Sequence, residues 1–169
     1  MSMESLIKKL QNIMRGDDLS GTVQYLKQMI WMIFLKIYDA QEEKWELLED
    51  DYTSIIPEEL KWRNWAVDNN DGKALTGDEL IKFVNDTLIM GLKKLEVNEY
   101  TPKRHLIVWQ MFQDASNFMK NGTKLRQMIN ELNQKDFTNS TETHEFGDMY
   151  ESMLKDLQES KRDGGEFYT

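Results

Sequence analysis

Residues 22 to 49 read T-V-Q-Y-L-K-Q-M-I-W-M-I-F-L-K-I-Y-D-A-Q-E-E-K-W-E-L-L-E. From Met29 to Leu35 every residue is apolar, so a helix over this stretch needs neighbours on all sides. The apolar run stops at Lys36, far short of the ~20 residues that a membrane span requires. We therefore predict the long central helix of a bundle, and we expect its acidic far end to be solvated. Helical spacing selects as its core-facing residues Val23, Leu26, Ile30, Ile33, Phe34 and Ile37.

Composition favours one all-α domain. The chain has 169 residues, with only two prolines and nine glycines, and it is rich in Leu, Met, Lys and Glu. We expect a helical bundle of five to seven helices around one long central helix, spanning residues 1-160. The absence of cysteine excludes disulfides and fits a cytoplasmic location. The net charge of -9 restricts any contact with nucleic acid to a local basic patch.

Cap signals and periodicity predict the remaining helices. Gly16 is expected to supply the left-handed residue that ends the first helix. Thr76 and Glu79 have the spacing of a capping box, and Thr101 and Thr123 precede two further helices as N-caps. The predicted helices besides the central one cover residues 4–15, 78–95 and 102–119, a shorter stretch after Thr123, and about 147–160.

The segment between the central helix and Gly77 lacks periodicity. Trp62 and Trp65 stand three residues apart within it, and we expect them to attach the segment to the core rather than to stack on a base. The run that begins at Asp68 is similar to a calcium loop, but Gly72 stands at position 5, where the calcium loop has its glycine at position 6. We interpret it as a polar turn.

The sequence contains no recognisable catalytic motif. His105 and His144 are the only histidines, and neither has the spacing of a metal-ligand pair. Phosphate-binding glycine loops, nucleophile elbows and zinc protease motifs are all missing. His105 follows Lys103 and Arg104 at a predicted helix start, where the three residues either touch phosphate or form solvated surface.

The end of the sequence indicates that the chain is cut from a longer protein. Gly164 and Gly165 are followed by Glu166-Phe167-Tyr168-Thr169, which leaves two aromatic residues with nothing after them to pack against. We expect residues 161-169 to be a linker and the start of a missing domain.

The sequence G-G-E-F-Y-T at 164–169 follows G-D-M-Y-E-S-M-L-K-D-L at 147–157. This arrangement resembles the junction in the modification (M) subunit of type I restriction-modification systems, where a G-x-x-Y-E helix leads into G-E-F-Y-T-P and the methyltransferase catalytic domain. The Phe-Leu-Lys of residues 34–36, followed by Asp39, resembles that family's long N-terminal helix. Similarity extends over nearly the whole chain through W-x-x-W, D-G-x-x-L-x-G-x-E-L and K-D-F.

The resemblance implies the N-terminal assembly and DNA-clamp domain of an adenine-specific DNA methyltransferase subunit. Its partners would be the specificity subunit, a second M subunit, the restriction subunit and double-stranded DNA. Catalysis, S-adenosylmethionine and the flipped adenine would belong to the following domain. In the full-length subunit the cofactor-binding segment would begin with Phe167, Tyr168 and Thr169. The candidates for DNA contact, chosen as clustered cations, are Lys103, Arg104, Lys120, Lys124 and Arg126.

Two other functions compete with this interpretation. A free-standing helical adaptor would bind a partner through a methionine-rich or aromatic groove, and an independent enzyme would need a constellation that the sequence lacks. The core positions of most methionines argue against the groove. The methionines available for such a groove are Met29, Met32, Met111, Met119, Met149 and Met153.

We predict that the 169-residue chain does not bind S-adenosylmethionine, because the motifs that would hold the cofactor are absent from its sequence. Titration calorimetry with S-adenosylmethionine measures this directly. Micromolar affinity would place the cofactor site inside this chain and contradict the prediction.

Overall fold

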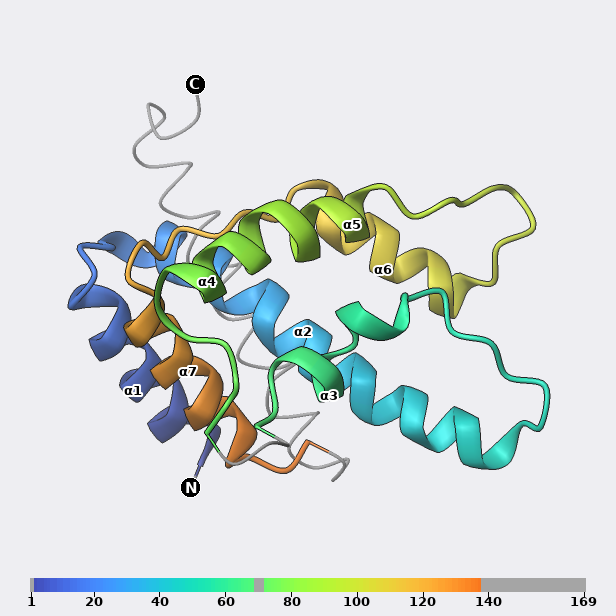
Figure 1. Cartoon of the computed structure of the whole chain (residues 1–169), viewed down its shortest axis with the longest axis horizontal. Coiled ribbons are helices and arrows are strands. Elements are labelled where there is room, and N and C mark those ends of the chain that lie inside the picture. Colours follow the sequence, from blue (N-terminus) through green and yellow to red (C-terminus); the bar gives the residue numbers. More distant parts are fainter. Residues whose placement is uncertain (1, 69–71, 138–169) are drawn as a thin grey trace.

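The computed structural model describes residues 2–68 and 72–137, which fold into a helical bundle without strands in this part of the chain (Figure 1). Because α4, η2 and α5 follow one another without a break, they form a single helix over 77–93, and the described residues contain six helices. The predicted all-α class is confirmed. The elements are α1 (Met3–Arg15), α2 (Gly21–Leu48), the 3-10 turn η1 (Glu58–Leu60), α3 (Trp62–Trp65), α4 (Gly77–Lys82), the π-helical η2 (Phe83–Leu88), α5 (Ile89–Lys93), α6 (Lys103–Gln113) and α7 (Gly122–Asn133).

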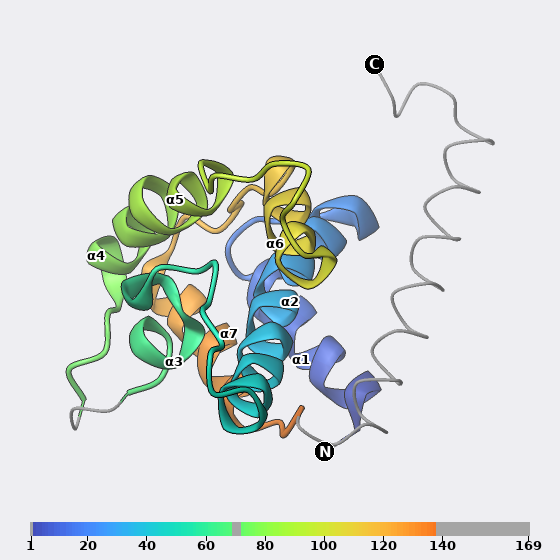
Figure 2. The same ribbon diagram turned by 90° about the vertical axis from the view of Figure 1, so that its right-hand side faces the viewer.

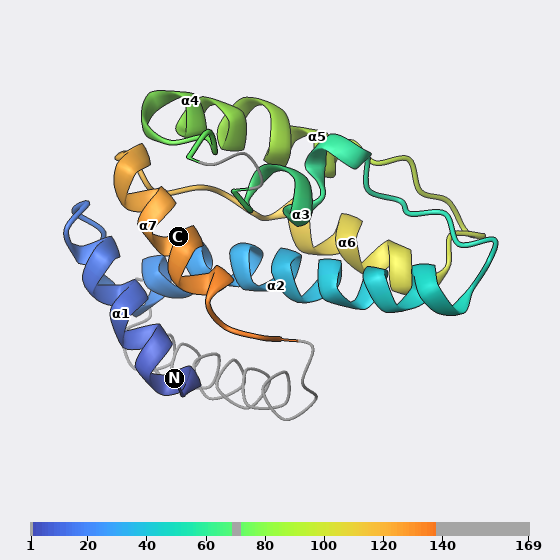
Figure 3. The ribbon, with the colours of Figure 1, turned by 60° about the horizontal axis from the view of Figure 1, so that its bottom comes forward.

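Helix α2 is the centre of the bundle, as the sequence predicts. Helices α1 and α7 pack together at one end of it, and α6 runs beside its other end (Figure 3). Seen from the side, α3, α4 and α5 lie on one side of α2 and α1 lies on the other (Figure 2). No helix among the described residues is long and apolar enough to cross a membrane.

The predicted core face of α2 is only partly right. Leu26 and Ile33 are buried, whereas Phe34 and three other predicted positions are half-buried. Since Phe34 is not fully buried, replacing it by alanine should cost less than the ~3–5 kcal/mol typical of a buried phenylalanine. The side chains that α2 buries in its apolar part include Met29, Trp31, Met32, Ile33 and Leu35.

Gln28 is buried in the apolar part of α2 and explains why α6 ends early. Its Oε1 accepts a hydrogen bond of 2.6 Å from the backbone of Phe118, and its Nε2 donates to Asn117 over 3.1 Å. The chain after Gln113 therefore runs extended along α2, and the predicted helix end at 119 is wrong. Met119 is nevertheless buried, as expected.

Several predicted caps are replaced by neighbouring residues. Gly16 is right-handed, and the left-handed residue between α1 and α2 is Asp18, with φ of 65°. The Thr76 side chain makes no capping hydrogen bond, although α4 begins directly after it. Pro102, one residue after the predicted Thr101, is the N-cap of α6, and the Asn121 side chain rather than Thr123 caps α7.

The methionines do not form a groove in the described part of the chain. Met29, Met32 and Met119 are buried, and Met111 packs half-buried against the core. Met149 and Met153 lie outside the described residues, as do the predicted helix over 147–160, the boundary at 160 and Phe167, Tyr168 and Thr169. The buried methionines remove the main support for the adaptor hypothesis.

Two glycines meet where α4 and α7 begin. A Cβ atom added to Gly122 would lie 1.8 Å from the carbonyl oxygen of Gly77, which no real structure tolerates. Gly77 has φ of 60°, so it also favours glycine for its backbone. The close packing of α4 against α7 therefore depends on the missing side chain at Gly122.

We predict that Gly122→Ala lowers the free energy of unfolding by about 3 kcal/mol or more, because α4 and α7 have to move apart. Gly16→Ala is the control, since its Cβ would meet the flexible end of Lys124 at 3.1 Å and the Ile13 carbonyl oxygen at 3.3 Å, far less tightly than at Gly122, and its φ is -66°. Urea unfolding followed by circular dichroism measures both. Equal midpoints for the two variants would contradict the prediction.

Candidate functional site

Trp62 and Trp65 attach the segment after α2 to the core, as the sequence predicts. Both are buried, and their rings meet edge to face with centroids 5.2 Å apart. The indole of Trp62 donates to Asn133 of α7 over 2.8 Å, and that of Trp65 donates to the Leu60 carbonyl over 3.1 Å. Hydrogen bonds at both indole nitrogens hold the two rings in one orientation.

Arg126 closes the loop that follows α3. Its Nη1 donates to the Ala66 carbonyl over 2.7 Å, and its Nε donates to the Leu75 carbonyl over 2.8 Å. Asn133 adds a second donor to the Ala66 carbonyl at 3.2 Å. One guanidinium of α7 thus joins the two ends of the 66–75 loop, and burial lowers the pKa of Arg126.

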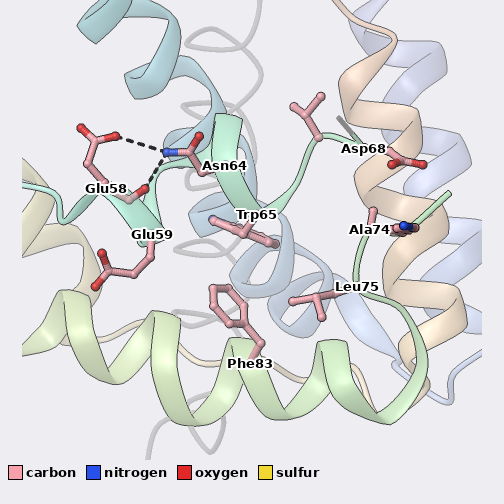
Figure 4. Close-up of a pocket in the computed structure, with 10 residues that line it drawn as sticks. Glu58, Glu59, Asn64, Trp65, Asp68, Ala74, Leu75 and Phe83 are labelled. Carbon is pink, nitrogen blue, oxygen red and sulfur yellow. Dashed lines mark hydrogen bonds between the residues drawn. The ribbon is translucent and has the colours of Figure 1, made fainter. Parts of the chain in front are cut away.

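This loop forms one wall of a pocket of about 590 Å³ (Figure 4). Trp65 lies in the middle of the pocket, Phe83 of η2 points toward it, and Leu75 lies beside Phe83. The Trp65 and Phe83 ring centroids are 5.6 Å apart. The floor of the pocket is therefore aromatic and aliphatic.

Acidic side chains line the pocket around this floor. Glu58 and Glu59 come from η1 and Asp68 from the loop, and Lys73 is the one cation among the lining residues. Glu58 also accepts from Lys61 over 2.7 Å, and this hydrogen bond lowers its pKa. Asp68 accepts from the Gly72 backbone over 2.7 Å, and residues 69–71 of the expected polar turn lie outside the described residues.

The acidic run at the far end of α2, residues 42–51, is mostly exposed, as expected, but one of its carboxylates, Glu42, is buried. Asp39 and Glu42 are buried, and together with Glu46 and Glu49 they follow one another at three- and four-residue spacing on one helix face. We call these four residues the carboxylate stripe. Arg63 of α3 donates to both Asp39 and Glu46 over 2.9 Å, and Lys61 lies 3.4 Å from Glu46. The stripe fastens α3 to α2.

Arg104 binds the last carboxylate of the stripe. Its two terminal nitrogens donate to Glu49 over 2.6 and 2.7 Å, and this pairing lowers the pKa of Glu49. The guanidinium also lies 4.8 Å from the ring centroid of Trp45 and 5.0 Å from that of Tyr52. Arg104, which the sequence suggested as a DNA contact, therefore joins α6 to the end of α2 instead.

His105 faces the same cluster. Its ring meets Tyr52 edge-on at 5.7 Å, and burial lowers its pKa, so the imidazole favours the neutral form. Tyr52 in turn donates to Glu42, and burial and this carboxylate raise the pKa of Tyr52. A neutral, half-buried His105 is poorly suited to bind phosphate.

The five predicted DNA-contact residues do not form one surface. Lys103 is exposed and Arg104 half-buried at the end of α2 that carries Glu49, whereas Lys120 and Lys124 lie near Asp17, before α2 begins. The 28 residues of α2 span about 42 Å between these ends. Arg126 is buried and bound to backbone carbonyls. Lys120 is exposed and Lys124 half-buried, and this pair remains a candidate because, unlike Lys103 and Arg104, it does not include a cation bound to Glu49.

The described residues contain no group of three or more histidine, cysteine, aspartate or glutamate side chains that could hold a metal ion. The carboxylate stripe is not such a group, because its members bind Arg63, Lys61, Tyr52 and Arg104 instead. The described residues therefore form an acidic pocket around Trp65 and two separate basic positions, at Lys103 and at Lys120.

The HsdM N-terminal domain model matches residues 3–132. The chain belongs to this family. Over its whole length it is also 52% identical to the type I restriction enzyme EcoEI methylase subunit of Escherichia coli, of which it covers 34%. This HsdM N-terminal domain therefore spans about a third of the length of that curated relative.

Solved structures agree with the family. One is a modification subunit of a putative type I restriction enzyme from Vibrio vulnificus YJ016, with a TM-score of 0.75, 28% identity and coverage of 95% of this chain and 36% of that one. A second comes from a structural study of complex assembly and conformational transition of the type I R-M system, with a TM-score of 0.74 and 31% identity. It matches 99% of this HsdM N-terminal domain and 32% of its own chain.

We predict that Arg126→Met lowers the free energy of unfolding by about 3 kcal/mol, since it leaves the Leu75 carbonyl without its donor and leaves the buried Ala66 carbonyl with the weaker donor Asn133 alone. Lys120→Met is the control, because Lys120 is exposed, and it should stay within about 0.5 kcal/mol of the parent chain. Chemical denaturation gives both values. A neutral Arg126→Met would show that the loop does not depend on this contact.

Proposed function

We propose that this chain is the assembly and DNA-clamp domain of an adenine-specific DNA methyltransferase subunit in a type I restriction-modification system. In this proposal it acts with the specificity subunit, a second M subunit and the restriction subunit on double-stranded DNA. The observation that carries the proposal is the family match over residues 3–132, together with 52% identity to a type I methylase subunit. A cytoplasmic location stays a prediction.

The chemistry of the described residues supports assembly, rather than catalysis, as the role of this domain in the subunit. No catalytic constellation is found among the described residues, and the pockets found there lack a metal-binding group. We propose that S-adenosylmethionine binds the full-length subunit, with Phe167, Tyr168 and Thr169 at the start of the cofactor-binding segment. Methylation would then occur in the part of the subunit beyond this chain.

Charge limits how the domain would meet DNA. The net charge of -9 disfavours a broad contact with phosphates, and Arg104 and Arg126 are already used within the bundle. We therefore propose the contact at Lys120, which lies just before α7, and Lys124, which lies in its first turn. Contacts of this kind bind without sequence preference, so sequence choice would come from the specificity subunit.

We predict that Lys120→Glu with Lys124→Glu, introduced into the assembled complex, lowers the slope of log affinity against log salt by about two units, because each lost phosphate contact removes about 0.9. DNA binding is measured by fluorescence anisotropy at several salt concentrations. Lys103→Glu, at the other end of α2, is the control and should change the slope by less than one unit. An unchanged slope for the double variant in an intact complex would remove α7 from the DNA surface. If no complex forms even with the unmodified chain, the proposed assembly function is wrong.

A further inference from the structure

The pocket around Trp65 is built before any ligand arrives. Trp65 is held by its hydrogen bond to Leu60 and by contact with Trp62, and Arg126 fixes both ends of the 66–75 loop. A binding surface whose side chains are already ordered loses little conformational entropy when a ligand binds. This rigidity distinguishes the pocket from a chance hollow between loops.

The floor of the pocket leaves apolar surface accessible. Val67 is 37% exposed, and Leu75 and Phe83 are half-buried beside Trp65. Leu75 of the loop and Phe83 of η2 lie together on one side of Trp65 (Figure 4). Such a floor suits an aliphatic or aromatic side chain of a ligand.

The charges at the pocket determine the class of ligand. Three carboxylates, Glu58, Glu59 and Asp68, line it with one ammonium group, that of Lys73. Glu58 is already paired with Lys61, and the charge of Asp68 interacts with that of Arg126, so the exposed Glu59 contributes most of the negative charge offered to a ligand. A phosphate, a nucleotide or a nucleic acid strand would be repelled, whereas lysine or arginine would be attracted. The aromatic floor adds to this preference, because cations are attracted to the faces of aromatic rings.

We propose that this pocket binds a short segment of a partner protein in which an apolar side chain stands next to lysine or arginine. The apolar side chain covers Trp65, Leu75 and Phe83, and the cations lie at the carboxylates around them. The inference rests on the proposed assembly function, to which it adds a contact surface and the chemistry of the partner. DNA is excluded as the occupant by charge.

Two probe peptides test the chemistry. Acetyl-RLFR-amide carries an apolar pair between two cations, and acetyl-ELFE-amide has the same pair between two carboxylates. Titration calorimetry with the 169-residue chain should show the basic peptide binding at least about tenfold more tightly, with affinity falling as salt rises. Shifts in the NMR spectrum should include the amides of Val67 and Leu75. Equal affinities, shifts confined to another face, or no binding at millimolar peptide would overturn the proposal.

Variants at the pocket should act in opposite directions. Glu59→Lys reverses an exposed lining charge and should weaken binding of the basic peptide at least about threefold, whereas Lys73→Glu should strengthen it. Glu99→Lys, which changes the net charge of the chain equally at an exposed loop position, is the matched control. If Glu99→Lys weakens binding as much as Glu59→Lys, the effect is one of total charge and the pocket is not the site. If Glu59→Lys does not fold, the affinity of Lys73→Glu for the basic peptide decides whether the pocket is the binding site.

A second measurement separates this inference from the assembly function. The full-length subunit is mixed with the specificity subunit and a second M subunit, and the complexes are sized by light scattering. Association that Glu59→Lys weakens and Glu99→Lys does not would support the pocket as the contact. Association that Glu59→Lys leaves unchanged, with no preference for the basic peptide, would overturn the pocket and keep the assembly function.

Discussion

The pairing of the carboxylate stripe on α2 is the interaction on which the rest of the bundle depends. An ionised side chain taken out of water costs several kcal/mol unless a partner and hydrogen bonds replace the lost hydration. Asp39 and Glu42 are buried in the second half of α2, so α3 and the segment before it have to supply Arg63 and Tyr52 at those positions. Glu49 is not buried in this way, since its side chain is 42% exposed, but its pairing with Arg104 joins the start of α6 to the end of α2.

The two halves of α2 therefore recruit their neighbours by different means. The first half is covered mainly by apolar contact, which α1 and α7 provide without strict geometry, and Gln28 adds directed hydrogen bonds to the chain after α6. The second half is covered by directed ion pairs and hydrogen bonds, which specify single partners. Arg63 binds α3 to α2 and Trp62 binds it to α7, so two independent contacts fix the position of α3. The pocket at Trp65 inherits that rigidity.

The sequence is sufficient to predict the helices and the role of the two tryptophans, because helical periodicity and buried aromatics depend mainly on local pattern. It is not sufficient for the carboxylate stripe, since a run such as E-E-K-W-E-L-L-E looks the same whether water or arginine faces it. The spacing of 39, 42, 46 and 49 was the available signal, and it becomes informative only when Arg63 and Arg104 are known to lie opposite. Caps moved by one or two residues for a related reason. Asn121 competes with Thr123, and long-range contacts such as that of Gln28 decide where α6 ends.

The same ambiguity explains the candidate DNA residues. The sequence shows where positive charges cluster in a chain of net charge -9, but it does not show which groups those cations contact. Arg104 and Arg126 are planar donors that satisfy several acceptors at once, which makes arginine the residue suited both to phosphate and to a bidentate internal contact. In this bundle both are used internally, whereas Lys103 and Lys120 remain exposed. Lysine is the more strongly hydrated cation and costs more to bury, which agrees with the exposure of these two candidates. Burial is not limited to arginine, because Lys61 is also buried and pairs with Glu58, so a cation's role in this bundle depends on the acceptors that face it.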